Sequence, residues 1–403
     1  MQETSATPAA VAGSPGRATP SDLTVMIGAL SVAAFASAVG MRAPDLLLPE
    51  IARDFGVTPG AASIIATMFA LAYGGVQFVA GPVSDRVGKV KVIAFACGLS
   101  FLASILCAMA ASLDQLTVAR VVGGLATGAV IPIAMAFIGD SVPYEQRQAV
   151  LARFLSGQIF GLVFGQAVGG AVSDAFGWRA MFLLLSVLYV AAAVTVALVG
   201  RRLDRPGAPP GAARPSLRSL LSRRKVAFVL AVVAVDGLVM FGAFTFVGTD
   251  LHDRGGLSLT EAGLMVMAFG IGGALFSLTV APMVRRLGRP RLAVFGALVV
   301  SLGYGVVWFL PSFPLAATGM LLTGYGFYAF HTTLQTEGTQ MIPEARGLGM
   351  ALFAALFFYG QSLGVTIGGW VYDGLGALPL YLFSAVGMPL LALVLARHLS
   401  PKG

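Results

Sequence analysis

Long apolar segments, separated by short polar turns, run along the chain from residue 23 to residue 397. A helix that crosses a lipid bilayer needs about 20 mostly apolar residues, and stretches of this length recur over the whole range. The pattern predicts about twelve spanning helices and therefore an all-α membrane protein. The predicted spans are 23–45, 61–82, 91–112, 115–138, 149–173, 178–200, 226–248, 261–284, 290–310, 315–338, 347–371 and 377–397.

Two polar stretches divide this pattern into parts. Residues 1–22 are rich in Ala, Pro, Ser, Thr and Gly, which cannot bury a core, so we predict a disordered cytoplasmic tail. Residues 201–225 combine several prolines with a cluster of Arg and Lys, which indicates a linker. We therefore predict two six-helix bundles, 23–200 and 226–398, joined by a cytoplasmic linker and followed by a short tail at 399–403.

Composition and charge agree with a membrane protein. The chain is 57% hydrophobic and 11% charged, which excludes a soluble domain, since globular proteins carry about 25% charged residues. If the amino terminus faces the cytoplasm, most Lys and Arg fall in turns on that side. We expect a multi-pass protein of the cell inner membrane with both termini cytoplasmic. The excess of positive charge then reflects topology and contact with the lipid bilayer, and not nucleic-acid binding, because no aromatic-interleaved basic patch accompanies it.

One charged turn is repeated. The sequence from Gly81 to Lys91 returns in degraded form at 281–291, and a repeat of that length indicates two related membrane bundles. The turn resembles the loop between helices 2 and 3 of the major facilitator superfamily. The residues that fit the pattern Gly-x-x-x-Asp-Arg-x-Gly-Arg/Lys-x-Arg/Lys are Gly81, Asp85, Arg86, Gly88, Lys89 and Lys91. The resemblance implies a gating loop whose aspartate meets the start of helix 11; the alternative is that these residues are only charges that set the topology.

Glycines recur at every fourth position in two matching helices. Such spacing forms a groove that lets another backbone approach closely, and in a transporter the groove could also be a sliding surface. The residues are Gly161, Gly165, Gly169 and Gly170 in the first bundle, and Gly360, Gly364, Gly368 and Gly369 in the second. The first run resembles the helix 5 antiporter motif of drug-efflux members of the superfamily, with Gln166 in place of its proline.

Several ionisable residues fall inside predicted spans, where a charge costs at least about 2.5–3.5 kcal/mol and so needs a reason. Asp45 begins an Asp-x-x-Leu-Pro element similar to that of multidrug-exporter-like members. Arg120 resembles the arginine of a helix 4 motif that the family associates with proton coupling. We hypothesise that Asp45 and Arg120 pair, that a proton on Asp45 releases Arg120, and that substrate and proton compete for this exchange. A static ion pair or an exposed Asp45 is the alternative. Asp236, near the midplane, is a second titrating site, a contact for a cationic substrate, or a protonated core residue.

Polar residues on helix 10 suit the lining of a cavity. Tyr328, His331 and Gln335 share one face at spacings of three and four, although a lone histidine can also be a satisfied buried residue. We assign Gln158, Gln166 and Gln361 to the same substrate cavity. Glu337 falls close to the cytoplasmic surface, where a solvated charge is expected.

The resemblance implies a proton-coupled antiporter that exports small amphipathic compounds or metabolites by alternating access between the bundles. An uptake permease or facilitator for a sugar or organic solute is the alternative, and a non-transporting membrane sensor is a third reading. An enzyme is not supported, because the chain lacks a His-Glu-x-x-His metal motif and Val83 replaces the first glycine of a phosphate loop. We expect a monomer that uses the proton gradient and needs no cofactor or metal.

Overall fold

The regular elements of this computed structural model are all helices within the residues that it describes, which are 20–200, 220–309 and 312–399. In chain order they are α1 (Pro20–Leu46), α2 (Leu48–Phe55), α3 (Pro59–Ala62), α4 (Ile64–Val87), α5 (Lys89–Met109), α6 (Leu113–Thr127), α7 (Val130–Ser141), α8 (Tyr144–Phe176), α9 (Trp178–Gly200), α11 (Arg224–Asp253), α12 (Leu259–Phe309), α13 (Phe313–Gln340), the 3₁₀ turn η1 (Pro343–Ala345), α14 (Arg346–Leu375) and α15 (Leu378–Leu399). Most of the predicted tail and linker lies outside the described residues.

Among the described residues, ten helical segments are long and apolar enough to cross a membrane. One of them, α12, is 51 residues long and covers the predicted span 261–284 and all but the last residue of 290–310, separated by a kink at Gly288. Another combines α6 and α7 into a single span, Leu113–Ser141. The helix α13 is 28 residues long and covers the predicted span at 315–338, although it is not among the ten. The prediction of an all-α membrane protein is confirmed.

A glycine with positive φ stands at the equivalent position of both copies of the repeated turn. Gly88 separates α4 from α5 with φ 107°, and Gly288 breaks α12 with φ 69°. Both values lie in the left-handed region, which glycine adopts at no steric cost. The repeat seen in the sequence therefore fixes equivalent reversals of the chain in the two halves.

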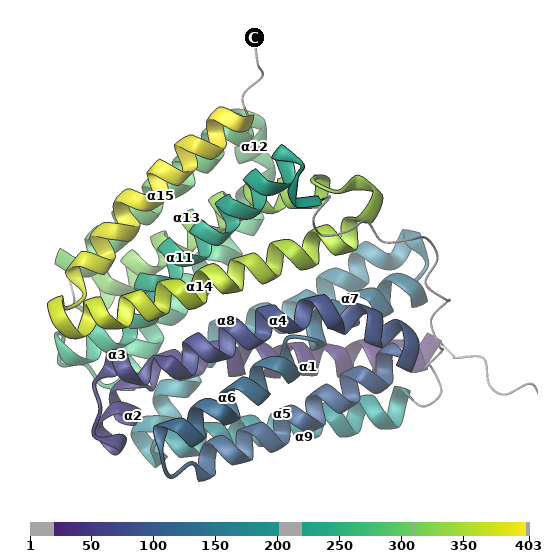
Figure 1. Ribbon diagram of the computed structural model, residues 1–403, viewed down its shortest axis with the longest axis horizontal. Coiled ribbons are helices and arrows are strands. Elements are labelled where there is room, and N and C mark those ends of the chain that lie inside the picture. The colour runs from purple at the N-terminus through teal and green to yellow at the C-terminus, as the bar shows by residue number, and fades with distance from the viewer. Residues whose placement is uncertain (1–19, 201–219, 310–311, 400–403) are drawn as a thin grey trace, which may run out of the picture.

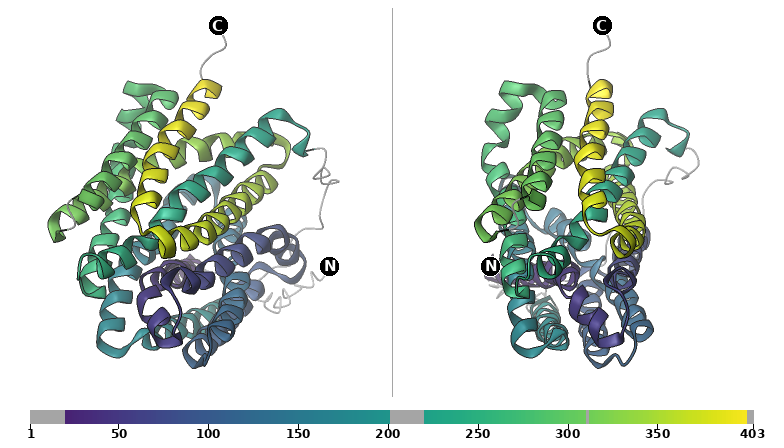
Figure 2. Two further views of the ribbon diagram at one scale, coloured as in Figure 1. Left: turned by 60° about the vertical axis from the view of Figure 1, so that its left-hand side comes forward. Right: turned by 90° about the vertical axis from the view of Figure 1, so that its left-hand side faces the viewer.

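The helices form two bundles (Figure 1). The helices α1 to α9, coloured from purple to teal, lie together, and the helices α11 to α15, coloured from teal-green to yellow, lie beside them, an arrangement that both views of Figure 2 repeat. Within the bundles α8 packs along α1 and α14 packs along α11. These are the glycine-rich helices: Gly161 faces the backbone of Phe35 in α1, and Gly360 faces that of Ala234 in α11. A side chain at either glycine would overlap a carbonyl oxygen, so the groove permits this backbone approach.

Candidate functional site

A cavity of about 760 Å³ lies between the two bundles. Its volume falls within the range of about 300–1,000 Å³ that is typical of small-molecule sites. Residues from α4, α7 and α8 line one side of the cavity, and residues from α13 and α14 line the other. The lining includes Asp85 at the end of α4 and Gly347 at the start of α14. The cavity therefore extends to the end of the molecule that carries the Gly81–Lys91 turn, which we name the basic end.

Two carboxylates join the bundles at the opposite end, the acidic end. Asp174, near the end of α8, accepts hydrogen bonds from the backbone N–H groups of Leu259 and Thr260 at 3.3 and 2.7 Å, where α12 begins. Asp373, near the end of α14, accepts one from the backbone N–H of Gly60 at 2.8 Å and one from the Thr58 hydroxyl at 2.5 Å. A carboxylate is favourable at a helix amino terminus because of the partial positive charge there.

These two contacts are equivalent in the repeat. Each aspartate lies four positions after the second glycine of a Gly-Gly pair. That second glycine also contacts the other bundle, because Gly170 packs against Leu259 and Gly369 against Gly60. The structure therefore holds the acidic end together while the cavity reaches the basic end. This combination describes one of the two orientations that an alternating-access protein adopts.

Replacing both aspartates by asparagine is expected to shift the protein toward opening at the acidic end. Each loss removes a carboxylate charge worth about 0.3–1 kcal/mol at a helix amino terminus, so the ratio of the two orientations should change by about 3- to 30-fold. Electron-spin distance measurements between labels at the exposed positions Phe176 and Leu375 test this in a background without cysteine. The control Asp114→Asn removes a charge from the same end, at the start of α6. Unchanged distances in the double variant would contradict the prediction.

A buried acid–base pair forms part of the cavity wall in the second bundle. Asp236 of α11 is completely buried, and its Oδ2 lies 2.7 Å from Nδ1 of His331 of α13. His331 lines the cavity, whereas Asp236 lies behind it. A buried carboxylate needs a partner, and the imidazole supplies one. In the part of the chain that the structure describes, Oδ1 of Asp236 has no partner.

A second buried ion pair lies on α1. The Arg42 guanidinium is 3.4 Å from Asp45, donates a hydrogen bond to Gln361 of α14 at 3.2 Å and stacks 4.0 Å from the ring centre of Phe241 in α11. Arg42 thus reaches from the first bundle into the second. Sequence reasoning did not consider Arg42 as a buried partner, although it falls inside the predicted span 23–45; the structure buries it in α1, which continues to Leu46. The spacing of three between Arg42 and Asp45 on one helix was the available signal.

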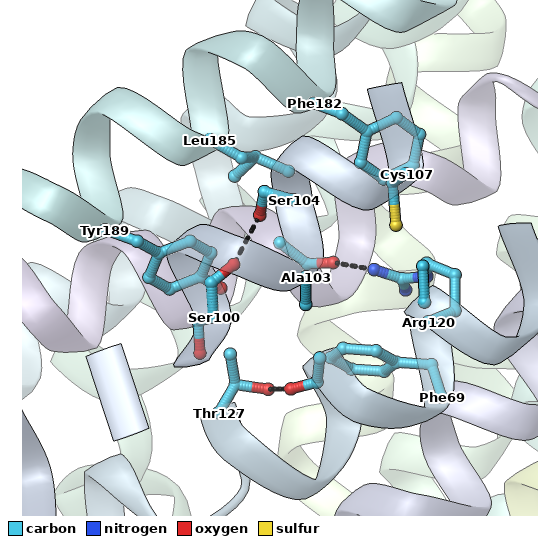
Figure 3. A pocket seen from close by; sticks show the side chains of 13 residues that line it. Phe69, Ser100, Ala103, Ser104, Cys107, Arg120, Thr127, Phe182, Leu185 and Tyr189 are labelled. Atoms are coloured by element: carbon cyan, nitrogen blue, oxygen red, sulfur yellow. Dashed lines mark hydrogen bonds between the residues drawn. The ribbon is translucent and has the colours of Figure 1, made fainter. Parts of the chain in front are cut away.

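Arg120 has different partners from those expected. Its guanidinium donates to the carbonyl oxygens of Gly40 at 3.0 Å and Ile65 at 3.4 Å. It also lies 3.9 Å from the ring centre of Phe69, and Figure 3 shows these two side chains close together. Beside it is a cavity of about 10 Å³, lined in part by Ser100, Ser104 and Tyr189, which is about the space one water molecule needs.

The hypothesised Asp45–Arg120 ion pair is therefore not present in this orientation. Asp45 instead pairs with Arg42, which lies one turn away on the same helix. Arg120 contacts one carbonyl oxygen of α1 and one of α4, together with a ring of α4. A role for Asp45 and Arg120 in proton coupling stays a prediction.

The predicted cavity residues fall into two groups. Gln158, His331 and Gln335 line the cavity. Gln361 instead binds Arg42, and Gln166 donates a hydrogen bond to the Arg42 carbonyl oxygen at 2.9 Å. Tyr328 is not among the lining residues either; its ring packs against Gly273, Phe269 and Phe327. Sequence reasoning missed the aromatic and amide contributions of α4 and α14, namely Tyr73, Gln77, Phe353, Phe357 and Phe358. Spacing identifies a common helix face but not the direction in which it points.

Comparison with known proteins agrees with this two-bundle architecture. The family model described as Major Facilitator Superfamily matches residues 30–255 and again residues 226–403. The chain belongs to the Major Facilitator Superfamily. At the level of this superfamily the protein is a membrane transporter and not an enzyme.

Superfamily members of several kinds resemble the chain. The uncharacterised transporter YceJ of Bacillus subtilis is 26% identical over 81% of this chain and 84% of its own. A gallate transporter of Pseudomonas putida is 28% identical, covering 87% and 85%. The multidrug resistance protein MdtL of Klebsiella pneumoniae is 23% identical, covering 88% and 90%. Among solved structures, the POT family transporter PepTSo shares the fold with a TM-score of 0.78 at 14% identity, covering 94% and 98%.

The superfamily turn is stabilised by ion pairs at the basic end. Lys89 contacts Asp85 at 3.2 Å and Asp140 at 2.9 Å, while Arg86 and Lys91 are exposed. In the second bundle Arg289 and Lys225 both contact Glu337, at 2.8 and 3.3 Å. Glu337 is therefore buried and paired, and the expectation of a solvated charge was wrong.

One stretch of α14 matches an enzyme motif in sequence but not in structure. Residues 360–364 read Gly-Gln-Ser-Leu-Gly, the pattern Gly-x-Ser-x-Gly of hydrolase nucleophiles. That motif requires a sharp turn between a strand and a helix, whereas Ser362 lies in the middle of α14 and donates a hydrogen bond to the Thr67 carbonyl oxygen at 2.6 Å. The serine therefore links α14 to α4 and is not a candidate nucleophile.

Proposed function

We propose that this transporter couples the export of small amphipathic compounds to the entry of protons by alternating access. The observation that carries the proposal is the buried Asp236–His331 pair in the wall of the central cavity. An ionisable group inside the membrane that faces a cavity indicates an ion or proton pathway. The energy source is the proton gradient, and the transporter acts as a monomer in the bilayer without a cofactor.

The basic end faces the cytoplasm in this proposal. Arg86, Lys89, Lys91 and Arg289 lie at that end, and cytoplasmic turns of membrane proteins carry an excess of Lys and Arg. Both termini are then cytoplasmic, and the protein lies in the inner membrane. The cavity in this structure is then open to the cytoplasm, where an exporter takes up its substrate.

Proton movement supplies the driving force. One charge moved through a membrane potential of about 100 mV contributes about 2.3 kcal/mol. In the proposed cycle Asp236 and His331 take a proton when the cavity faces outward and release it when the cavity faces the cytoplasm. Asp45 is a second buried carboxylate, and its ion pair with Arg42 contacts the opposite bundle, so the charge of Asp45 can affect closure of the acidic end.

The direction of transport draws support from the named relatives. The multidrug resistance proteins MdtL and MdtD resemble the chain over most of its length, which favours export. The gallate transporter, at 28% identity, favours a second candidate, proton-driven uptake of an organic solute. The buried acid–base pair serves either direction, since a symporter and an antiporter both need a titratable group within reach of the substrate.

Inverted membrane vesicles test the proposal. With a pH-sensitive dye inside and an established proton gradient, a panel of uncharged aromatic compounds, lipophilic cations, sugars and organic acids is added in turn. We expect at least one compound to dissipate the gradient in vesicles that contain the protein and not in empty vesicles. If the folded protein transports radiolabelled compounds but never moves protons, the coupling proposal fails and a facilitator remains.

A further inference from the structure

The His331 side chain presents a single nitrogen to the cavity. Its Nδ1 is occupied by Asp236, and the rings of Phe327, Phe353 and Phe357 surround the imidazole with centre-to-centre distances of 5.1, 5.7 and 4.9 Å. Within the described residues Nε2 has no protein partner. Since His331 lines the cavity, Nε2 is the atom that a bound compound can contact.

Whether Nε2 carries a hydrogen depends on how many protons the Asp236–His331 pair holds. Without an added proton, Asp236 is a carboxylate that accepts from Nδ1–H, so Nε2 carries a lone pair and accepts hydrogen bonds. With one added proton, Nε2 carries a hydrogen whether the proton between Nδ1 and Oδ2 lies on the imidazole or on the carboxyl group. Protonation therefore converts Nε2 from an acceptor into a donor.

The cavity offers few charges to a bound compound. Its polar lining consists mainly of the amides Gln77, Gln158 and Gln335, interleaved with aromatic rings such as Tyr73 and Phe357. Among the described lining residues, Asp85 is the one carboxylate, and it is paired with Lys89 at the basic end. The other described lining residue that can carry a charge is His331. A charged compound deep in the cavity would lack a counter-charge, since Asp236 is screened by His331, and an unpaired charge in the membrane is costly.

We infer that the cavity takes uncharged aromatic compounds that carry hydroxyl or N–H donors, and that the donor and the proton compete for Nε2 of His331. The inference rests on the proposed proton-coupled export. The aromatic rings of the wall pack against the ring of the compound, and the glutamine amides satisfy its further polar groups. The compound donates to the bare Nε2, and a proton on Nε2 removes that acceptor.

The residues around His331 indicate that the pH dependence of binding comes from the Asp236–His331 pair. Asp236 of α11 is the charged group in contact with the imidazole, while α14 contributes Phe353 and Phe357. On α13 itself the neighbour is Phe327. Arg42 of α1 reaches this cluster through the ring of Phe241, on which it stacks. One proton should therefore compete with one molecule of the compound.

Three catechols of matched shape test the inference on the purified full-length protein. They are 4-ethylcatechol, which is uncharged, dopamine, which is a cation, and 3,4-dihydroxyphenylacetate, which is an anion. Titration calorimetry should show that 4-ethylcatechol binds at least about tenfold more tightly than either charged analogue. Once the pH is low enough to protonate the pair, the affinity for 4-ethylcatechol should fall by up to about tenfold for each further unit by which the pH is lowered. Binding should then release up to one proton.

Two variants separate the role of Nε2 from packing. His331→Gln keeps hydrogen-bonding capacity without titration, so binding of 4-ethylcatechol should persist and lose its pH dependence. His331→Phe keeps an aromatic ring without an acceptor and should weaken binding at every pH. Tightest binding of dopamine or of the anion, failure of all three catechols to bind folded protein, or an unchanged pH dependence in His331→Gln would each overturn the inference. In those cases the proposed function still stands if other compounds drive proton flux in vesicles, and it fails separately if none does.

Discussion

Replacing Asp236 with asparagine is expected to abolish proton-coupled transport while the protein remains folded. Asparagine has nearly the same shape and can keep the hydrogen bond to Nδ1 of His331, but it cannot bear a charge. His331 then has no carboxylate to stabilise its protonated form, so the cavity no longer exchanges a proton as it changes orientation. Because asparagine also removes the free-energy cost of burying a carboxylate completely, the thermal unfolding temperature should not fall.

Two assays in the same vesicles check this expectation. Gradient-driven accumulation of a substrate should drop to the level of empty vesicles, whereas exchange of labelled for unlabelled substrate, which needs no gradient, should persist. The matched control is Asp253→Asn, which removes an exposed carboxylate of the same helix that accepts a hydrogen bond from Tyr372. Full gradient-driven accumulation by the Asp236 variant would return Asp236 to the role of a structural core residue.

The fold was predictable because each membrane helix is specified by a continuous local stretch of the sequence. Each span is a run of apolar residues of the right length, and glycine marks the reversals at Gly88 and Gly288. The repeat also placed Asp174 and Asp373 in matching positions, although it did not reveal that both join the bundles at the acidic end.

The partners of the buried charges were not predictable in the same way. Depth in the membrane follows from counting residues, but the direction in which a side chain points depends on how helices pack. Asp45 and Arg120 were expected to pair because they share a depth, yet Arg42 is nearer on the same helix. Gln166 and Gln361 were assigned to the cavity as polar residues in apolar helices, and both serve Arg42 instead.

Replacing Arg42 with methionine is expected to destabilise the protein strongly. Asp45 is buried, so without Arg42 it becomes a buried carboxylate that has lost its salt-bridge partner. Breaking one side of a buried ion pair costs about 3–5 kcal/mol, whereas removing both charges is often nearly neutral. The double variant Arg42→Met with Asp45→Asn should therefore recover most of the lost stability. Thermal unfolding of the purified protein measures both, and a double variant no more stable than the single one would show that Arg42 stabilises the protein through Phe241 and Gln361 and not through Asp45.

The same experiment with Arg120 decides between the two pairings of Asp45. Arg120 is held by the carbonyl oxygens of Gly40 and Ile65 and by the ring of Phe69, so Asp45→Asn should not rescue Arg120→Met. Rescue of Arg42→Met alone would assign the ion pair to α1, as in this structure. Rescue of both would mean that Asp45 interacts with both arginines over the transport cycle. The carboxylate would then exchange partners as the acidic end opens, and the hypothesis drawn from the sequence would describe the other orientation of the same protein.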